Sequence, residues 1–441
     1  MDLSALQVRL YIAPLLSLTI FLSVLNGVMF NVAVPDIARD YQISPGLVSW
    51  VITAYIIIFA FGSVVYTRLG QRFHLRDLIS IGLILFCAGG LLGFLSDSFP
   101  WLVASRMLQA SGASGIPALS MMLATVYVPY HMRGHLLGVI ASTVAFGLGI
   151  GPILGGLIAG YLHWNYLLLT PLVLLPVLFL LRRFLPRQND LRPASLDWPG
   201  GLLLAGAVSA LVIMVNMRLA LLILPVILLA TAFILRIRST SEPFVYPDLF
   251  DNRSYPWGLL TALLVICTIL ATLFLMPMMF RNIHDMCTLF IGLHIFPGAM
   301  SAALAGQVAG RMVDRRGAAP VVRAGFLILL LGFGLLMITA GKSAWISAAA
   351  MIPANSGFTV IHSSLAGAVS STLPQGRVGL GMGVFNLVFF VSGALGTAAA
   401  GMFLDILGPD QGKSYSLIFA GCIGLAATGL LLFTRNFKKV A

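Results

Sequence analysis

Apolar segments long enough to cross a bilayer follow one another along nearly the whole chain. A membrane helix needs roughly 17–25 apolar residues, and fourteen segments fit that description. These are residues 10–34, 47–69, 77–95, 101–126, 136–162, 164–181, 198–214, 219–235, 255–280, 289–310, 319–340, 345–369, 380–403 and 417–434. Hydrophobic residues make up 59% of the 441 positions and charged residues 9%, which is more apolar surface than a soluble core uses. We therefore predict an all-α protein embedded in a lipid bilayer.

Basic residues between the segments favour one orientation. With the N-terminus inside, twenty of the 26 Lys and Arg residues fall in inside connections and five in outside ones, which leaves Arg106 alone within a segment. This asymmetry follows the positive-inside rule. It predicts a multi-pass protein of the cytoplasmic (inner) membrane with both termini in the cytoplasm. Because the basic residues punctuate apolar runs and do not cluster with aromatics, the net charge of +12 does not indicate nucleic-acid binding.

The two longest connections divide the chain into three parts. Residues 182–197 and 236–254 hold most of the Pro, Arg and acidic residues of the connections, and they bracket the seventh and eighth segments. We predict an N-terminal six-helix bundle (1–181), a central two-helix insert with flanking cytoplasmic linkers (182–254) and a C-terminal six-helix bundle (255–441). A 6+2+6 pattern is typical of a duplicated transporter, with pseudo-two-fold halves and a substrate path between them.

Glycines spaced four residues apart mark the fifth segment. The stretch contains Gly147, Gly151, Pro152, Gly155 and Gly156. On a helix, the four-residue spacing of the first three of these glycines forms a stripe without side chains, where another helix can approach closely. The proline removes one backbone hydrogen bond and predicts a bend. Such stripes often mean packing alone, so packing and a flexible seam between the halves both stay open.

A short connection of the second half has a partly matching counterpart in the first. The two stretches are Gly310-Arg311-Met312-Val313-Asp314-Arg315-Arg316-Gly317 and Thr67-Arg68-Leu69-Gly70-Gln71-Arg72-Phe73-His74. A carboxylate such as Asp314 can accept helix N-terminal amides and pair with an arginine from the other half, which would form a cytoplasmic gate. Gln71 cannot supply that charge in the first copy. The alternative is a plain basic turn.

Four motifs at the expected helices resemble one family. The Gly310–Gly317 loop resembles G-x-x-x-D-R-x-G, and the glycine stretch resembles the antiporter motif G-x-x-x-G-P-x-x-G-G. Residues 25–35 resemble a first-helix motif, and residues 106–112 resemble R-x-x-Q-G-x-G with Ala110 for its first glycine. The chain is similar to the fourteen-helix drug:proton antiporter branch of the major facilitator superfamily, and in details after residue 244 to its tetracycline-exporter group. The resemblance implies the major facilitator fold.

Arg106 is the candidate for a role in the translocation path. A charge inside a membrane segment is costly, so it usually faces a cavity or a partner. With no acid in its own segment, its partner must come from another helix. Arg106 and Gln109 match the family motif, and the resemblance implies proton transfer or the anchoring of a polar network. The alternative is a snorkelling or structurally packed arginine.

Carboxylates are missing where exporters of this branch often carry them. All fourteen acidic residues fall near segment ends or in connections. The positions that resemble the acid sites hold Asn26 with Gly27, Leu148 and Gly393. Export of a tetracycline–metal complex or a dication by buried carboxylates is therefore not expected.

Other residues remain candidates for proton coupling and for a cavity lining. Asp36 and Asp405 end the first and thirteenth segments, and His362 lies within the twelfth. Histidine titrates in the useful range, although a solvated helix end and a structural histidine are the alternatives. The residues predicted to line a neutral cavity are Asn26, Asn31, Asn355, Asn386 and His294.

Three functions stay open. The first is a secondary active exporter of small amphipathic drugs or metabolites, working by alternating access with proton antiport. The second is a metabolite or siderophore transporter, or a facilitator, without the usual carboxylate coupling. The third is a transporter-like sensor that does not transport. No P-loop, metal-ligand cluster or nucleophile elbow occurs in the sequence, so no enzyme activity, cofactor or metal is predicted. The predicted partners are a small-molecule substrate, protons and lipid, and the protein is expected to be a monomer.

Overall fold

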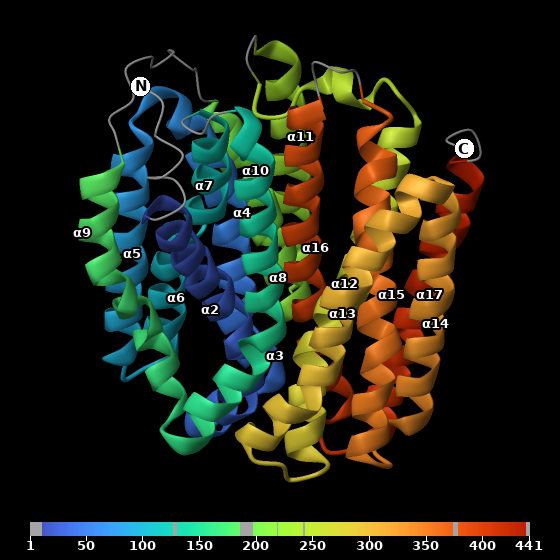
Figure 1. Ribbon diagram of the computed structural model, residues 1–441. Helices are drawn as coiled ribbons and strands as arrows, with labels where there is room; N and C mark the ends of the chain where they lie inside the picture. Colours follow the sequence, from blue (N-terminus) through green and yellow to red (C-terminus); the bar gives the residue numbers. More distant parts are fainter. Residues whose placement is uncertain are drawn as a thin grey trace.

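Helices joined by short connections make up the molecule (Figure 1). The computed structural model describes residues 11–126, 130–185, 197–217, 219–240, 243–373 and 378–437. The N-terminal group comprises α2 (Ala13–Asp40), α3 (Pro45–Val48), α4 (Trp50–Arg72), α5 (Leu75–Phe94), α6 (Phe99–Ala113), α7 (Gly115–Val126), α8 (Tyr130–Tyr161), the 3-10 helix η2 (Trp164–Leu174) and α9 (Leu175–Phe184). The C-terminal group comprises α12 (Ser254–Asn282), α13 (Thr288–Arg316), α14 (Ala318–Thr339), α15 (Ala344–Ser370), α16 (Val378–Leu407) and α17 (Gly412–Asn436). Between the groups lie α10 (Trp198–Met217), η3 (Ala220–Leu222), α11 (Ile223–Ser239) and η4 (Pro247–Phe250).

Twelve helices of the described chain are long and apolar enough to cross a membrane, against the fourteen expected. The difference lies in the fourth and fifth predicted segments. The fourth is divided at Ser114 into α6 and α7, each too short by itself, although Ser114 keeps helical backbone angles (φ −61°, ψ −30°). In the fifth, the apolar stretch found in α8 is Phe146–Tyr161, which is too short to count as a crossing.

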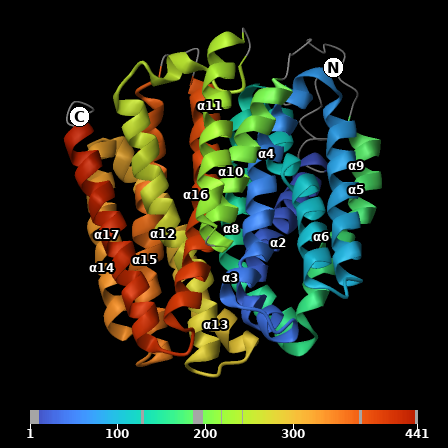
Figure 2. The ribbon, with the colours of Figure 1, turned by 180° about the vertical axis from the view of Figure 1, so that it is seen from behind.

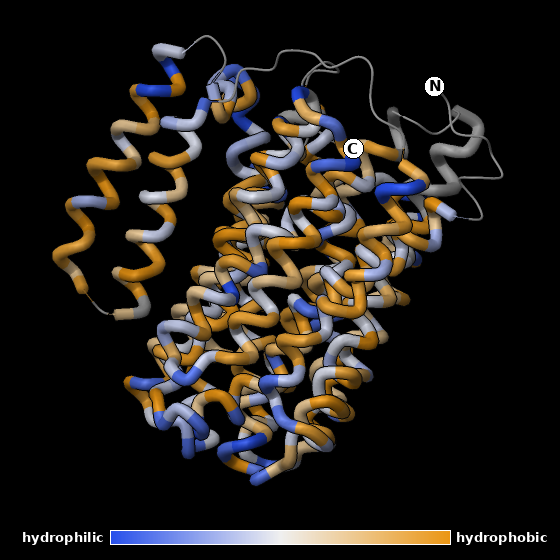
Figure 3. The backbone as a smooth tube through the Cα atoms, turned by 90° about the vertical axis from the view of Figure 1, so that its left-hand side faces the viewer, coloured by the Kyte–Doolittle hydropathy of each residue, from blue (hydrophilic) through white to orange (hydrophobic). Residues whose placement is uncertain are grey.

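The two groups meet along three helix junctions. α8 packs on α13, α2 packs on α12, and α3 with α4 packs on α16. Figure 1 shows the α8–α13 junction at the front, and Figure 2 shows α4 and α16 at the back. Hydrophilic residues gather at both ends of the molecule, whereas apolar residues dominate the middle (Figure 3). This distribution is the one that a bilayer requires.

The helices α10 and α11 form a hairpin at the side of the bundle (left in Figure 3). α10 buries Val208 and Val212 against a small apolar cluster that α4 and α16 complete with Ile57, Phe61 and Leu387, among others. α11 has no buried residue. The hairpin therefore covers the outer side of the α4–α16 junction with one helix and presents the other to lipid.

Asp197 ties the base of this hairpin together. Its side chain is 1% exposed, and it accepts hydrogen bonds from the backbone N–H groups of Gly200 (3.0 Å) and Phe244 (3.3 Å). It also pairs with Arg236 Nε of α11 at 3.2 Å. One carboxylate thus caps α10, holds the end of α11 and fixes the linker that follows.

We expect Asp197→Ala to lower the free energy of unfolding by about 2 kcal/mol, because it removes a helix cap and leaves buried donors unpaired. Thermal unfolding of the purified protein in detergent measures the loss. The matched control is Asp251→Ala, since Asp251 is an exposed acid in the linker that follows α11. Equal stability of the two variants would contradict the role of Asp197 in holding the base of the hairpin together.

Candidate functional site

Arg106 is fully buried at the centre of the N-terminal group. Its Nη1 donates a 2.8 Å hydrogen bond to Asn26 Oδ1 of α2 and a second bond to Gln109 Oε1 one turn along α6. The partner does come from another helix, as expected, but it is an amide and not a carboxylate. None of the ion pairs found among the described residues includes Arg106.

Aromatic faces supply the rest of the arginine's surroundings. The guanidinium carbon lies 3.9 Å from the ring centre of Phe30 on α2 and 4.1 Å from that of Tyr55 on α4. A cation over an aromatic face gains about 2 kcal/mol when both groups are desolvated. Sequence reasoning missed both rings, although Phe30 lies one helical turn from Asn26, a spacing that places the two on the same face of α2.

A proline creates the second acceptor of this network. Pro171 has no N–H, so the carbonyl of Leu167, four residues earlier, lacks the partner that it would have in an α-helix. That carbonyl accepts hydrogen bonds from Asn26 Nδ2 (3.4 Å) and Thr170 Oγ1 (2.8 Å), and Asn26 also donates to Thr170 Oγ1 (3.1 Å). Asn26 is thereby held by η2 and oriented toward Arg106. The proline in the sixth segment was a sequence signal for this contact.

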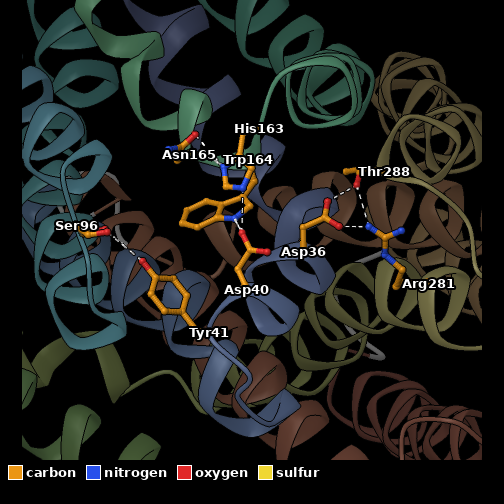
Figure 4. A network of polar contacts seen from close by, with 9 residues as sticks. All are labelled: Asp36, Asp40, Tyr41, Ser96, His163, Trp164, Asn165, Arg281 and Thr288. Carbon is orange, nitrogen blue, oxygen red and sulfur yellow. Dashed lines mark hydrogen bonds and ion pairs between the residues drawn. The ribbon is translucent and has the colours of Figure 1, made fainter.

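Asp36 forms a contact between the two groups at the end of α2 (Figure 4). Arg281, in the last turn of α12, pairs with Asp36, and the hydroxyl of Thr288, at the start of α13, donates to the same carboxylate. Arg281 is oriented by a 2.9 Å bond to the carbonyl of Met286. Asp36 therefore does not lie free at a solvated helix end but has partners in the other group. We call the end of the molecule that carries Asp36 and Asp405 the acidic end.

Asp405, at the end of α16, makes a second contact between the groups at the acidic end. It accepts hydrogen bonds from the backbone N–H of Gly46 (3.0 Å) and the hydroxyl of Ser44 (3.1 Å). Ser44 is the N-cap of α3, so a carboxylate of one group lies at a helix N-terminus of the other, where the helix dipole favours it. Gly46 permits this approach, because a Cβ there would lie 2.2 Å from Asp405 Oδ2.

Asp40 belongs to a separate network within the N-terminal group (Figure 4). It accepts a hydrogen bond from the Trp164 indole and lies 3.0 Å from His163 Nε2. Tyr41 donates to the carbonyl of Ser96 at 3.3 Å. These bonds fix the end of α2 to the start of η2 and to the connection after α5, so that Asp36 projects from a firm support.

The glycine stretch of α8 contacts two different helices, one in its own group and one in the other. A Cβ on Gly147, Gly151 or Gly155 would meet Val24, Val28 or Met29 of α2, within the same group. This follows from their four-residue spacing, which places them on one face.

Gly156 is offset by about 100° from that face and lies against α13 of the other group. A Cβ added to Gly156 would lie 2.9 Å from the carbonyl oxygen of Thr288. Gly292 of α13 is approached as closely from the other side, since a Cβ added to it would lie 2.4 Å from the carbonyl oxygen of Pro152. The α8–α13 junction therefore depends on glycine from both sides.

The opposite end, which we call the basic end, carries the loop signature. Arg311, Arg315 and Arg316 are exposed there and take part in none of the ion pairs of the described residues. The side chain of Asp314 lies outside the described part of the chain. Gly317 ends α13 with φ +79°, a backbone conformation that favours glycine, and a Cβ on Gly310 would meet nothing within 4 Å.

Three residues after the first copy of the loop signature, Asp77 supplies a carboxylate that forms an ion pair. It lies in the first turn of α5 and pairs with Arg182 of α9 at 3.3 Å. That contact stays within the N-terminal group.

The remaining candidates lie in dissimilar surroundings. His294 is 2% exposed, bonds the Phe290 carbonyl at 2.8 Å and packs 4.2 Å from the Trp345 ring. Asn355 is buried and donates to the Met351 carbonyl of its own helix at 2.9 Å.

Asn26 is fully buried in the arginine network, so of the predicted cavity-lining residues only Asn31 and Asn386 keep accessible surface, the former half-buried and the latter exposed. His362 is half-buried among phenyl rings, and its Nε2 has no hydrogen-bond partner.

Comparison with known proteins gives one family. The family model described as Major Facilitator Superfamily matches residues 16–397. The riboflavin transporter RibZ of Clostridioides difficile is 25% identical over 386 residues, which is 86% of this chain and 84% of that protein. The methyl viologen resistance protein SmvA of Salmonella typhimurium is 26% identical over 396 residues, with coverage of 86% and 79%.

Solved structures show the same fold. An inward-facing, unoccupied bacterial homologue of the human lysosomal transporter Spinster superposes with a TM-score of 0.70 at 14% identity and covers 99% of both chains. The nucleoside transporter NupG also gives a TM-score of 0.70, at 12% identity, and covers 96% of this chain and all of its own. These relatives and this fold are those of transporters, not of enzymes.

Removing one ring from the surroundings of Arg106 should destabilise the protein more while the cation is present. We expect Tyr55→Leu to lower the free energy of unfolding by about 2 kcal/mol, and to cost much less in an Arg106→Met background. Unfolding in detergent measures both. Phe86→Leu, a buried phenyl of α5 with no contact to the guanidinium among the ring contacts found, should cost the same in both backgrounds. Equal losses for Tyr55→Leu in both would contradict the interaction.

Proposed function

Because the chain belongs to the major facilitator superfamily, we propose that it is a secondary active exporter of small amphipathic drugs or metabolites. Relatives named for multidrug and methyl viologen resistance support export. The observation that carries the proposal is that the two ends of the molecule differ in their contacts between the groups. Asp36 and Asp405 join the groups at the acidic end, whereas the described arginines of the loop signature join nothing at the basic end.

Alternating access follows from this difference. We propose that the N-terminal and C-terminal groups are two six-helix halves that rock about the α8–α13 and α4–α16 junctions. Breaking the contacts at the acidic end, while the loop signature closes the basic end, would expose the substrate path to the other side. The contacts of Asp36 and Asp405 are polar, and both carboxylates are at least partly exposed, so water can replace their partners when the groups separate.

The membrane arrangement is proposed on the same grounds. We place fourteen crossings by counting α6 with α7 as one and the whole of α8 as another, which keeps the 6+2+6 division. The basic end then faces the cytoplasm with both termini, and the acidic end faces outward. We further propose that the protein works as a monomer in the cytoplasmic (inner) membrane.

Proton antiport is proposed through the acidic-end carboxylates. A proton that binds Asp36 removes the charge that pairs with Arg281, and a proton on Asp405 weakens its contact with the N-terminus of α3. Proton binding would therefore compete with closure of that end. Arg106, held by neutral partners, would keep its charge and anchor the N-terminal half during the cycle.

Transport should depend on a proton gradient and on Arg106. We expect proteoliposomes to accumulate ethidium or riboflavin faster when a proton gradient is imposed, and Arg106→Ala to abolish that uptake while the protein stays folded. Arg106→Lys should fail as well, because an ammonium cannot stack on two rings and also reach two amides. Fluorescence of the trapped dye measures the flux, and uptake indifferent to the gradient and to uncouplers would refute proton coupling.

A disulfide across the acidic end should stop the cycle. A Cβ on Gly401 of α16 would lie 3.2 Å from Ser49 Cβ at the start of α4, close to the separation of about 3.8 Å that a disulfide needs. In a chain whose native cysteines are replaced by serine, Ser49→Cys with Gly401→Cys should lose flux on oxidation and regain it with reductant. Ser49→Cys alone is the control. Continued flux through the fully oxidised protein would contradict alternating access.

A second function has support of its own. The riboflavin transporter among the relatives, and the lack of a carboxylate near Arg106 among the described residues, favour a metabolite transporter or facilitator that moves its substrate without these carboxylates. If Asp36→Asn, Asp405→Asn and His362→Asn each leave gradient-driven flux intact, none of these three residues is the coupling group. Flux of any substrate in liposomes would exclude a sensor that does not transport.

A further inference from the structure

A continuous series of ring contacts begins at the buried arginine and crosses to the other group. Tyr55, whose face covers Arg106, stacks on Phe59 one turn along α4 at a centroid distance of 5.9 Å. Phe59 in turn lies 5.2 Å from Phe390 of α16. The contact between Phe59 and Phe390 therefore joins the N-terminal and C-terminal groups through aromatic rings at the level of the arginine network.

The series continues through the C-terminal group to His362. Phe390 lies 5.3 Å from Phe389, and Phe389 lies 5.0 Å from the imidazole of His362 on α15. Phe358 and Phe385 flank the same imidazole at 5.7 and 5.6 Å. The series thus connects Arg106 and His362 through rings alone. We define the aromatic strip as Phe59, Phe390, Phe389, His362 and Phe358, all of which are half-buried.

The accessible surface of the strip faces the inside of the molecule. On α4, Ile57 and Phe61 are buried in the cluster that α10 covers, and Phe59 is two residues from each, which places it on the opposite face of the helix. On α16, Leu387 belongs to the covered cluster, and Phe389 is again two residues away. Phe390, three residues after Leu387, packs against that cluster beneath the hairpin and touches Phe59 from there. Because the hairpin closes the outer side of this junction, these rings are turned away from lipid.

The chemistry of the strip selects a class of ligand. Half-buried rings offer stacking faces to a planar ring system. None of the ion pairs found among the described residues lies at these rings, and the charge of Arg106 at one end of the series repels a second cation. The unpartnered Nε2 of His362 and the exposed amide of Asn386, one turn before Phe390, offer hydrogen bonds.

We propose that the aromatic strip binds the planar, uncharged heteroaromatic part of the transported molecule, between the two groups. This inference rests on the proposed function and adds the substrate class to it. Phe59 on one side and Phe390 on the other are the residues that would hold the ring system. Since they touch each other in this structure, a ligand would have to enter between them as the groups separate.

Binding of riboflavin to the purified protein in detergent tests the proposal without any transport step. Stacking of the flavin on aromatic side chains quenches its fluorescence, so a titration gives the Kd. We expect Phe59→Leu and Phe390→Leu each to weaken binding about tenfold, the usual scale of one lost stacking contact. Phe390→Tyr should keep the affinity because it keeps the ring. Phe179→Leu is the matched control, because Phe179 is 73% exposed on α9, away from the strip.

Ethidium, a planar cation, serves as the second probe and should bind at least about tenfold more weakly than riboflavin. The proposal is overturned if the wild-type protein binds neither probe, if ethidium binds as tightly as riboflavin, or if the two Leu variants keep the wild-type Kd while eluting as folded monomers. Failure of the proposed function looks different. Flux that ignores a proton gradient would refute antiport, yet it would leave riboflavin binding and its loss in Phe59→Leu unchanged.

Discussion

The positive charge of Arg106 in the membrane interior is the constraint around which the N-terminal group is built. Moving such a charge out of water costs several kcal/mol even after relaxation. Here that cost is offset without a counter-ion, by two ring faces and two amide oxygens from α2, α4 and α6. Each of these partners must keep its position for the charge to stay buried. The relative placement of three helices, and of η2 through Asn26, therefore follows from one side chain.

Charged contacts between the groups differ from the Arg106 network in position and in exposure to water. Asp36 and Asp405 lie at the acidic end, where each contacts the other group through donors that water can replace. Asp77 and Asp197 hold contacts within one group or within the hairpin. The molecule thus has a buried cation without a counter-ion inside one group and partly exposed carboxylates where the two groups meet. Among the charged contacts, separation of the groups breaks only those of the second kind.

Much of the fold could be predicted because apolar length and basic connections are properties of the sequence itself. The helices and the central hairpin follow from those patterns, and the lack of an acid in its own segment predicted that Arg106 has its partner on another helix. The aromatic partners could not be predicted, since Phe30 and Tyr55 look like any other apolar residues until packing brings their faces to the guanidinium. Gly156 belongs to the same motif as the stripe, but its 100° offset places it against α13 of the other group. The number of crossings was affected by Ser114, where a short break divides a helix without turning the chain.

The hairpin makes the two sides of the molecule unequal in their exposure to the bilayer. One junction between the groups, α4 with α16, carries α10 as an outer layer. In Figure 1 the other junction, α8 with α13, stands at the front, and among the described helices none is layered over it. Of these two junctions, the glycine-lined one is therefore the one that lies open to lipid tails. The hairpin thus gives the paired groups a shielded back and an uncovered front within the bilayer.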